Sequence, residues 1–120
     1  MKLQKSLIFF MTLFLLVSCT NDSDSDLNDN QVPVSITYTN SIKSIIDANC
    51  ISCHGTSPTN GASISLKTYQ NVKDAELNFG LILRISKAQG AAGMMPNGGT
   101  RLPQSKIDEV INWKNNGFKE

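Results

Sequence analysis

The 120-residue sequence contains a single histidine, His54, and only three cysteines, Cys19, Cys50 and Cys53. A metal or cofactor site in this chain therefore has at most one imidazole ligand. A structural zinc site takes four ligands, mostly cysteine and histidine. Residues 34–120, which we expect to form the globular part, contain only Cys50, Cys53 and His54, which are too few for a zinc site.

Two further patterns are missing. No stretch alternates apolar and polar residues over enough positions to predict a sheet, so we expect an all-α fold. Clustered positive charge is also absent, because the nine basic side chains of residues 34–120 are spread along the chain among six acidic ones. Such spread charge is typical of a solvated surface. We therefore predict no nucleic-acid partner.

The N-terminal residues have the pattern of an export signal. Lys2 and Lys5 precede the apolar run 7–17, which is too short to span a bilayer as a stable helix. The run leads into Leu-Val-Ser-Cys at residues 16–19, which resembles the lipobox of bacterial lipoproteins. This resemblance implies that residues 1–18 are a signal peptide that is removed, and that Cys19 receives a lipid. The alternative is ordinary secretion with Cys19 unmodified.

A polar segment follows the predicted lipid site. Residues 20–33 consist largely of asparagine, aspartate and serine, and have too few apolar side chains to form a core. We expect residues 19–33 to be a flexible acidic tether and residues 34–120 to be one globular domain. The protein is then expected outside the cytoplasm, anchored by lipid to a bacterial membrane on its periplasmic side or at the cell surface.

The segment Cys50-Ile51-Ser52-Cys53-His54 has the pattern Cys-x-x-Cys-His, which is typical of c-type haem attachment. Both thiols can form thioethers with haem vinyl groups, and His54 is then placed to be the proximal iron ligand. A disulfide between Cys50 and Cys53 remains an alternative, because export favours oxidised thiols. A thioredoxin-like redox pair would lie in a βαβ pattern, which the sequence lacks.

The glycine-rich segment 90–99 contains Met94 and Met95, the only methionines that remain once the signal peptide is removed. Because the chain has no second histidine, a methionine sulfur is the expected sixth ligand of a haem iron. The thioether is soft and its side chain is flexible enough to reach across a loop. We favour Met95, which directly precedes Pro96, and keep Met94 as the alternative.

Helical periodicity predicts three helices before this loop, over residues 38–49, 69–77 and 81–87. Thr39 or Ser41 is the candidate N-cap of the first helix, and Thr68 is the candidate N-cap of the second. Their expected core residues are Ile42, Ile45, Ile46, Tyr69, Val72, Leu81, Ile82 and Ile85.

A fourth helix is expected near the C-terminus. Pro103 suits the first helical position. An apolar stripe follows, made of Ile107, Val110, Ile111 and Trp113. Gly117 is the expected left-handed residue just past the helix. Phe118 would then contact Trp113 and close a Schellman motif.

These features together resemble the small class I cytochrome c domain. The resemblance covers about residues 34–120 and rests on the motif 50–55, on Met95-Pro96 about forty residues later, and on the last helix. It implies a cytochrome c fold of three to five helices wrapped around one covalent haem c, with the first and last helices crossing. The implied ligands are His54 and Met95, and the implied attachment sites are Cys50 and Cys53.

The chain also departs from that family. Met94 lies beside Met95, and Pro58 comes earlier after His54 than in the mitochondrial members. The carbonyl group that orients His54 is therefore left open.

Saturated iron coordination predicts a one-electron carrier and not an enzyme, because no iron position is free for a substrate. The resemblance implies donor and acceptor redox proteins as partners. Two alternatives stay open: a haem-based ligand-binding or sensor module with a labile methionine, and a cytochrome subunit of a larger redox complex.

The lipid anchor can be tested by metabolic labelling. Cells that make the protein in the presence of radioactive palmitate should yield labelled protein, and the Cys19→Ala variant should carry no label. Autoradiography of the purified proteins measures this. An unlabelled wild-type protein would contradict the lipid anchor.

Overall fold

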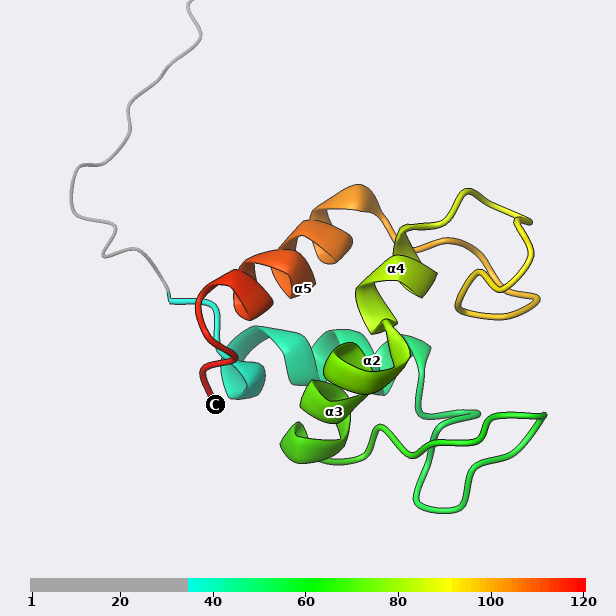
Figure 1. The fold of residues 1–120 in the computed structure, drawn as a ribbon, viewed down its shortest axis with the longest axis horizontal. Coiled ribbons are helices and arrows are strands. Elements are labelled where there is room, and N and C mark those ends of the chain that lie inside the picture. Colours follow the sequence, from blue (N-terminus) through cyan, green and yellow to red (C-terminus); the bar gives the residue numbers. More distant parts are fainter. Residues whose placement is uncertain (1–34) are drawn as a thin grey trace, which may run out of the picture. The chain divides into compact units, whose positions relative to one another are not determined.

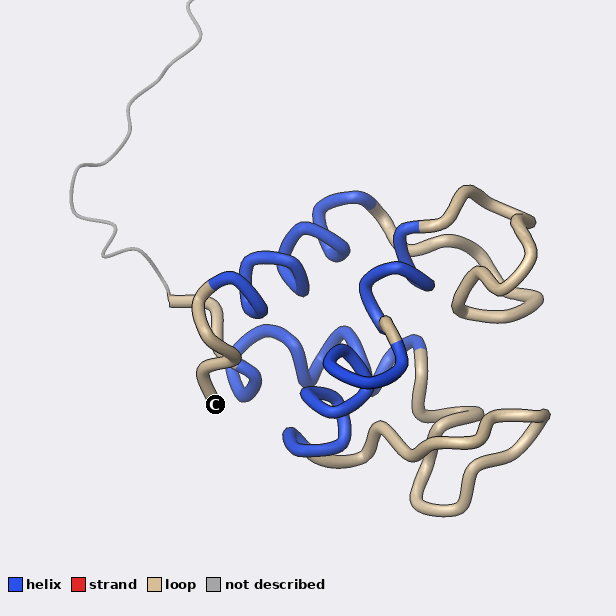
Figure 2. The backbone as a smooth tube through the Cα atoms, viewed as in Figure 1, coloured by secondary structure: helices blue, strands red, loops and turns tan. Residues whose placement is uncertain are grey.

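The described part of the chain contains helices and loops. The computed structural model describes residues 35–120, whereas the predicted signal peptide, the tether and Cys19 lie outside the described residues. The element order is η1 Tyr38–Ile42, α2 Lys43–Asn49, α3 Tyr69–Phe79, α4 Leu81–Ser86 and α5 Gln104–Asn115 (Figures 1 and 2). Residues 35–120 include no strand, which confirms the predicted all-α class.

The π-helical turn η1 runs directly into α2, so that together they cover the predicted range 38–49. The N-cap is Thr37, and the prediction of Thr39 or Ser41 was wrong. The Oγ1 of Thr37 accepts a hydrogen bond from the Asn40 backbone N–H at 3.2 Å, and the Asn40 side chain accepts one from the Thr37 N–H at 2.9 Å. This reciprocal box uses asparagine where glutamate or glutamine is usual, which hides it in the sequence.

Helices α3 and α4 meet at a single residue. Thr68 caps α3 as predicted, since its hydroxyl accepts from the Asn71 N–H at 3.2 Å. Helix α3 continues two residues beyond the predicted end and stops at Gly80, which has left-handed torsion angles of φ 63° and ψ 52°. Only glycine adopts this conformation readily. Helix α4 begins at the next residue and ends at Ser86, one residue earlier than predicted.

The N-terminus of α4 has no capping side chain of its own, and Glu76 of α3 takes that place. Its Oε2 accepts a hydrogen bond from the Ile82 N–H at 2.8 Å, and its Oε1 lies 2.5 Å from the Nζ of Lys114 on α5. A carboxylate at a helix N-terminus is also favoured by the helix dipole. Because Glu76 is only 9% exposed, it ties three helices together from inside the domain.

The end of α5 has the predicted Schellman motif. Gly117 has a φ of 79°, the Gly117 N–H donates to the Lys114 carbonyl at 3.0 Å, and the Phe118 N–H donates to the Trp113 carbonyl at 2.9 Å. The rings of Trp113 and Phe118 meet edge to face with centroids 4.9 Å apart. Pro103 is the residue before the helix, not its first residue, because its ψ of 143° is extended.

An aromatic cluster joins the beginning and the end of the domain. It consists of Tyr38, Tyr69, Trp113 and Phe118, whose neighbouring ring centroids lie 4.9–6.2 Å apart. The carbonyl of Lys119 accepts from the Tyr38 backbone N–H at 2.8 Å and from the Trp113 indole N–H at 2.7 Å. The hydroxyl of Tyr69 donates to the Phe118 carbonyl at 2.8 Å. Each aromatic pair contributes about 0.5–1.5 kcal/mol beyond the area it buries.

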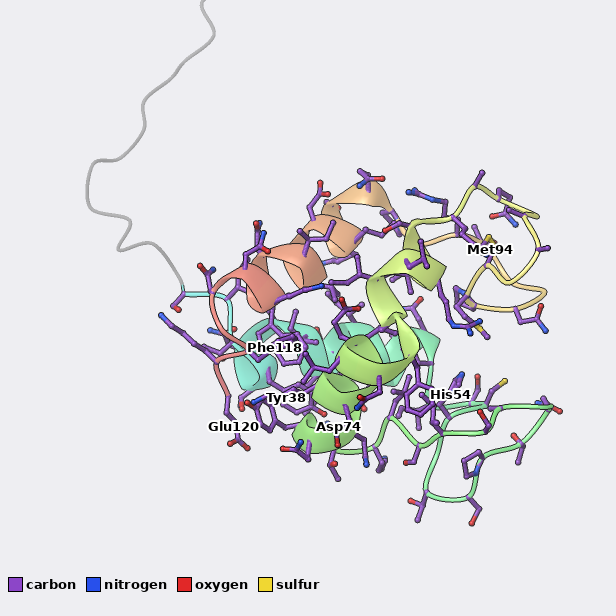
Figure 3. All side chains as sticks on the ribbon, in the orientation of Figure 1. Tyr38, His54, Asp74, Met94, Phe118 and Glu120 are labelled. Atoms are coloured by element: carbon purple, nitrogen blue, oxygen red, sulfur yellow. The ribbon has the colours of Figure 1, made fainter. Side chains whose placement is uncertain are left out.

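The remaining core fills the space between the helices. Helix α4 packs against α3 and α5, and α5 packs against η1. The most deeply buried side chains are Ile42, Val72, Ile107, Val110 and Trp113. The two long loops, residues 50–68 and 87–103, lie at the end of the domain away from Tyr38 and Phe118 (Figures 1 and 3). No helix within residues 35–120 is long and apolar enough to cross a membrane.

Replacing Glu76 with alanine should lower the free energy of unfolding by about 1–3 kcal/mol, because the part-buried Ile82 N–H loses its acceptor. Urea denaturation measures the loss. The matched control is Glu109→Ala, which removes the partly exposed ion pair with Lys106 and should cost less than about 1 kcal/mol. An equal loss in both variants would show that Glu76 does not tie the helices.

Candidate functional site

A cavity of about 670 Å³ lies between the two long loops, with α3 and α4 forming one wall. Its volume is within the range of about 300–1,000 Å³ that is common for ligand and cofactor sites. Cys50, Cys53, His54 and Met95 all line this cavity, although about forty residues separate the motif from Met95. The fold therefore brings together the four residues that the sequence singled out.

The two cysteines and the histidine lie on one turn of chain at the end of α2. The Cys50 N–H donates to the Ile46 carbonyl at 2.8 Å and so continues the helical hydrogen bonding. The Cys50 carbonyl then accepts from the Cys53 N–H at 3.2 Å and from the His54 N–H at 2.8 Å. This turn directs all three side chains to the same cavity. Both cysteines are free thiols, so the alternative of a disulfide is not present in this structure.

The two thiols have different surroundings. Cys50 packs against the core, and burial raises the pKa of its thiol to about 11. It therefore stays protonated at neutral pH and is a poor nucleophile as a free thiol. Cys53 is closer to polar groups, since its sulfur accepts a hydrogen bond from the Asn60 amide at 3.6 Å.

The imidazole of His54 is oriented by a backbone carbonyl. Its Nδ1 lies 2.8 Å from the oxygen of Ile64. A carbonyl can only accept, so Nδ1 carries a proton, and in the neutral imidazole Nε2 then has a free lone pair. This is the arrangement typical of a metal-ligating histidine, in which the outer hydrogen bond fixes the ring and its tautomer. The carbonyl group that orients His54 is therefore that of Ile64.

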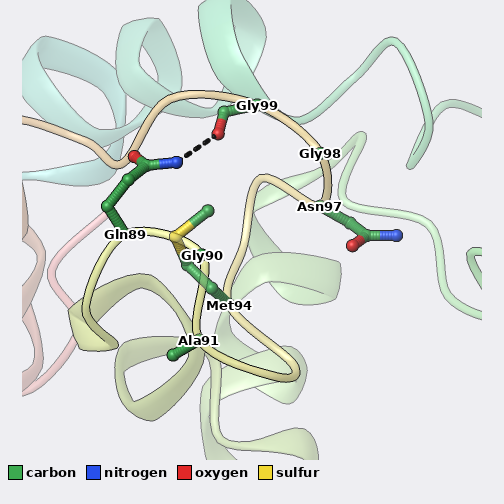
Figure 4. Close-up of a pocket in the computed structure, with 7 residues that line it drawn as sticks. All are labelled: Gln89, Gly90, Ala91, Met94, Asn97, Gly98 and Gly99. Carbon is green, nitrogen blue, oxygen red and sulfur yellow. Dashed lines mark hydrogen bonds between the residues drawn. The ribbon is translucent and has the colours of Figure 1, made fainter.

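The two neighbouring methionines point to different places. Met95 is partly buried and lines the large cavity, and its N–H donates to the Arg84 carbonyl at 3.2 Å. Met94 is 4% exposed and lines a separate cavity of about 250 Å³ inside the loop, between Gln89 and Gly99 (Figure 4). Of the two sulfurs, only that of Met95 belongs to a residue of the large cavity.

Among residues 35–120, Arg84 is the only Lys, Arg, Asp or Glu residue that lines the large cavity. Its Nε donates to the Phe79 carbonyl at 3.2 Å, which holds the side chain against the end of α3. The three ion pairs among the described residues do not include Arg84. A guanidinium without a carboxylate partner favours a ligand with an anionic edge. This role could not be predicted from the sequence, because Arg84 resembles any basic residue on an exposed helix face.

Apolar surface is left uncovered around the α3–α4 corner. Leu77, Phe79 and Leu83 are the exposed large apolar residues of the described chain, with 58%, 52% and 68% exposure. Phe79 also lines the large cavity. Of these three residues, Phe79 is therefore the one through which exposed apolar surface reaches the cavity wall.

A site for a bare metal ion is not formed. Among the residues that the structure describes, no three histidine, cysteine, aspartate or glutamate side chains are grouped so that they could hold an ion. The cavity offers one imidazole nitrogen, one thioether sulfur and two thiols within largely apolar walls. These groups could hold a flat apolar cofactor that brings most of its own metal ligands.

Comparisons with protein-family models, with curated proteins and with solved structures find no match to this chain. The chemistry of the cavity residues therefore carries the functional conclusion.

Proposed function

We propose that this chain is a lipid-anchored class I cytochrome c that holds one haem and transfers single electrons between partner proteins. The observation that carries the proposal is that Cys50, Cys53, His54 and Met95 line one cavity of about 670 Å³. The Nε2 of His54 is free to bind a metal, because Nδ1 is held by Ile64.

The walls of the cavity fit a haem in three respects. Leu66, Leu81 and Ile85 provide apolar contacts for a porphyrin face. In the described part of the chain no carboxylate lines the cavity, whereas Arg84 can pair with the propionates that a haem carries. The uncovered side of Phe79 would be shielded by a cofactor that fills the space beside it.

The two thiols would attach the cofactor covalently. Addition of each S–H across a vinyl double bond would join sulfur to one vinyl carbon and hydrogen to the other, so the attachment would need no oxidant. His54 and Met95 would hold the iron through an imidazole nitrogen and a thioether sulfur. When bound, the haem supplies a one-electron Fe(III)/Fe(II) couple.

The surroundings of the ligands tune that couple. The Ile64 carbonyl makes the imidazole of His54 more basic and keeps its orientation. Methionine ligation and the apolar walls both favour the reduced iron, and thus raise the reduction potential. If His54 and Met95 both bind the iron, no iron position would be open to a substrate, which favours an electron carrier over an enzyme.

The resemblance to class I cytochromes supplies the rest of the proposal. The resemblance implies that the first and last helices cross, and the packing of η1 against α5 supports this. The lipid on Cys19 and the acidic tether, both outside the described residues, would hold the domain near a bacterial membrane. Its partners are then a donor and an acceptor redox protein, either free or as neighbouring subunits of a larger complex.

One observation favours a second candidate, a haem-based sensor. Met95 lies in a loop that contains four glycines, Gly90, Gly93, Gly98 and Gly99. Glycine has more backbone freedom than other residues. Opening of this loop would therefore gain more conformational entropy than opening of a loop without glycine. A sensor would release Met95 and bind a gas, whereas a carrier would keep the ligand.

The Cys50→Ala, Cys53→Ala double variant should lack covalent haem and be largely unfolded. A domain of fewer than about 90 residues has a thin core, and such small scaffolds usually need a cofactor or cross-link for stability. The pyridine haemochrome assay measures the haem, and circular dichroism measures the helix content. A haem-free variant with the helix content of the wild type would show that the cofactor is not needed for folding.

Met95→Leu should abolish the weak ferric absorption band of methionine–iron ligation, because leucine has no sulfur to bind the iron. Met94→Leu is the matched control and should keep the band, since leucine can fill the cavity inside the loop. Optical spectra of the oxidised proteins decide between the two residues. Loss of the band only in Met94→Leu would make Met94 the ligand.

A further inference from the structure

The loop that contains Met95 is closed by side chains. We call residues 87–101 the methionine loop, which leaves the end of α4 and returns towards α5. Its four glycines disfavour any single conformation. Within the loop, the backbone makes only short-range turns, such as the Ala91 N–H to the Ala88 carbonyl at 3.0 Å and the Gly99 N–H to the Pro96 carbonyl at 3.2 Å.

Gln89 links the outgoing half of the methionine loop to the returning half. Its Nε2 donates to the Gly99 carbonyl at 3.0 Å (Figure 4), and its Oε1 accepts from the Arg101 backbone N–H at 2.6 Å. One amide side chain thus binds an acceptor and a donor on the opposite half. These are the bonds that a neighbouring strand would make, although neither half is a strand.

Arg101 makes the reverse connection. Its Nε donates to the Lys87 carbonyl at 3.0 Å, so that a side chain of the returning half binds the backbone of the outgoing half. The Nζ of Lys87 donates to the Ala92 carbonyl at 2.7 Å within the outgoing half. The base of the methionine loop is therefore held by crossed contacts from Gln89 and Arg101.

The closed loop encloses Met94 and thereby fixes Met95. Met94 is 4% exposed in the interior that Gln89 and Gly99 help to line. The next residue, Met95, faces the large cavity and is tied to α4 by its N–H bond to the Arg84 carbonyl at 3.2 Å. If the two halves of the loop separate, the Met94 side chain becomes exposed. Met95 is then held only by its N–H bond to the Arg84 carbonyl and no longer by the packing of its neighbour Met94.

We propose that Gln89 is a positioning residue, which bridges the methionine loop and so controls how readily the Met95 sulfur leaves the iron. This inference rests on the proposed function, because it needs Met95 to be an iron ligand. Gln89 is exposed and lies outside the core, so its effect is on local opening of the loop and not on unfolding of the domain. With Gln89 in place, the domain behaves as an electron carrier that excludes external ligands.

The experiment uses the full-length, haem-loaded protein and two external ligands. Imidazole binds the ferric iron and carbon monoxide binds the ferrous iron once Met95 has left, and stopped-flow absorbance gives both rates. Gln89→Ala should bind both about tenfold faster than the wild type, because two hydrogen bonds that close the loop are lost. Gln70→Ala is the matched control, since Gln70 makes a single exposed side-chain bond to Asp74 on α3.

A second variant separates closure from folding. Gln89→Glu keeps an acceptor for the Arg101 N–H but loses the donor to the Gly99 carbonyl, so it should fold and still bind imidazole faster than the wild type. Hydrogen exchange of the Arg101 amide should accelerate in Gln89→Ala, while the thermal midpoint of both variants stays near that of the wild type.

Two results would overturn the inference, and they can be told apart. If the wild type has the ferric methionine band but Gln89→Ala and Gln89→Glu bind imidazole at the wild-type rate, Gln89 does not position Met95 and the proposed function stands. If the wild type lacks the band and binds carbon monoxide at once, the assignment of Met95 as a ligand fails, and this inference fails with it.

Discussion

The Lys119 carbonyl holds the two ends of the domain together, because it accepts hydrogen bonds both from the Tyr38 N–H at the start of the first helix and from the Trp113 indole in the last. Both donors, Tyr38 and Trp113, belong to the aromatic cluster and are buried. With the helices fixed there, the opposite end consists of two loops that lack a core of their own. The cavity lies between those loops, so a ligand that binds in it would complete the packing that the helices leave unfinished.

Much of the fold follows from local patterns. The range of the first helix, the Thr68 cap and the Schellman motif at Gly117 depend on residues within about one helical turn of each other, and each was predicted from the sequence. The N-cap of the first helix was missed, since its box pairs Thr37 with Asn40. The role of Glu76 could not be predicted, because its partners Ile82 and Lys114 come together only in three dimensions.

The candidate site shows the same division. The residues that could bind a cofactor were evident, because the spacing in Cys50–His54 is itself the signal. The surroundings of these residues were not evident from the sequence. The Ile64 carbonyl that orients His54 lies ten residues further along the chain, and Arg84 belongs to another helix. The choice between Met94 and Met95 depends on which interior each residue enters, and adjacent positions in a glycine-rich loop carry no such information.

The two sides of the cavity differ in how freely they can change during evolution. The α3–α4 corner tolerates little change, because Gly80 is the single residue between the two helices and has a left-handed conformation. Residues 56–59 are exposed, and they are not among the residues that line the cavity. Descendants of this protein can therefore change residues 56–59 to suit new partners, while the α3–α4 corner, and with it Phe79 and Arg84, stays in place.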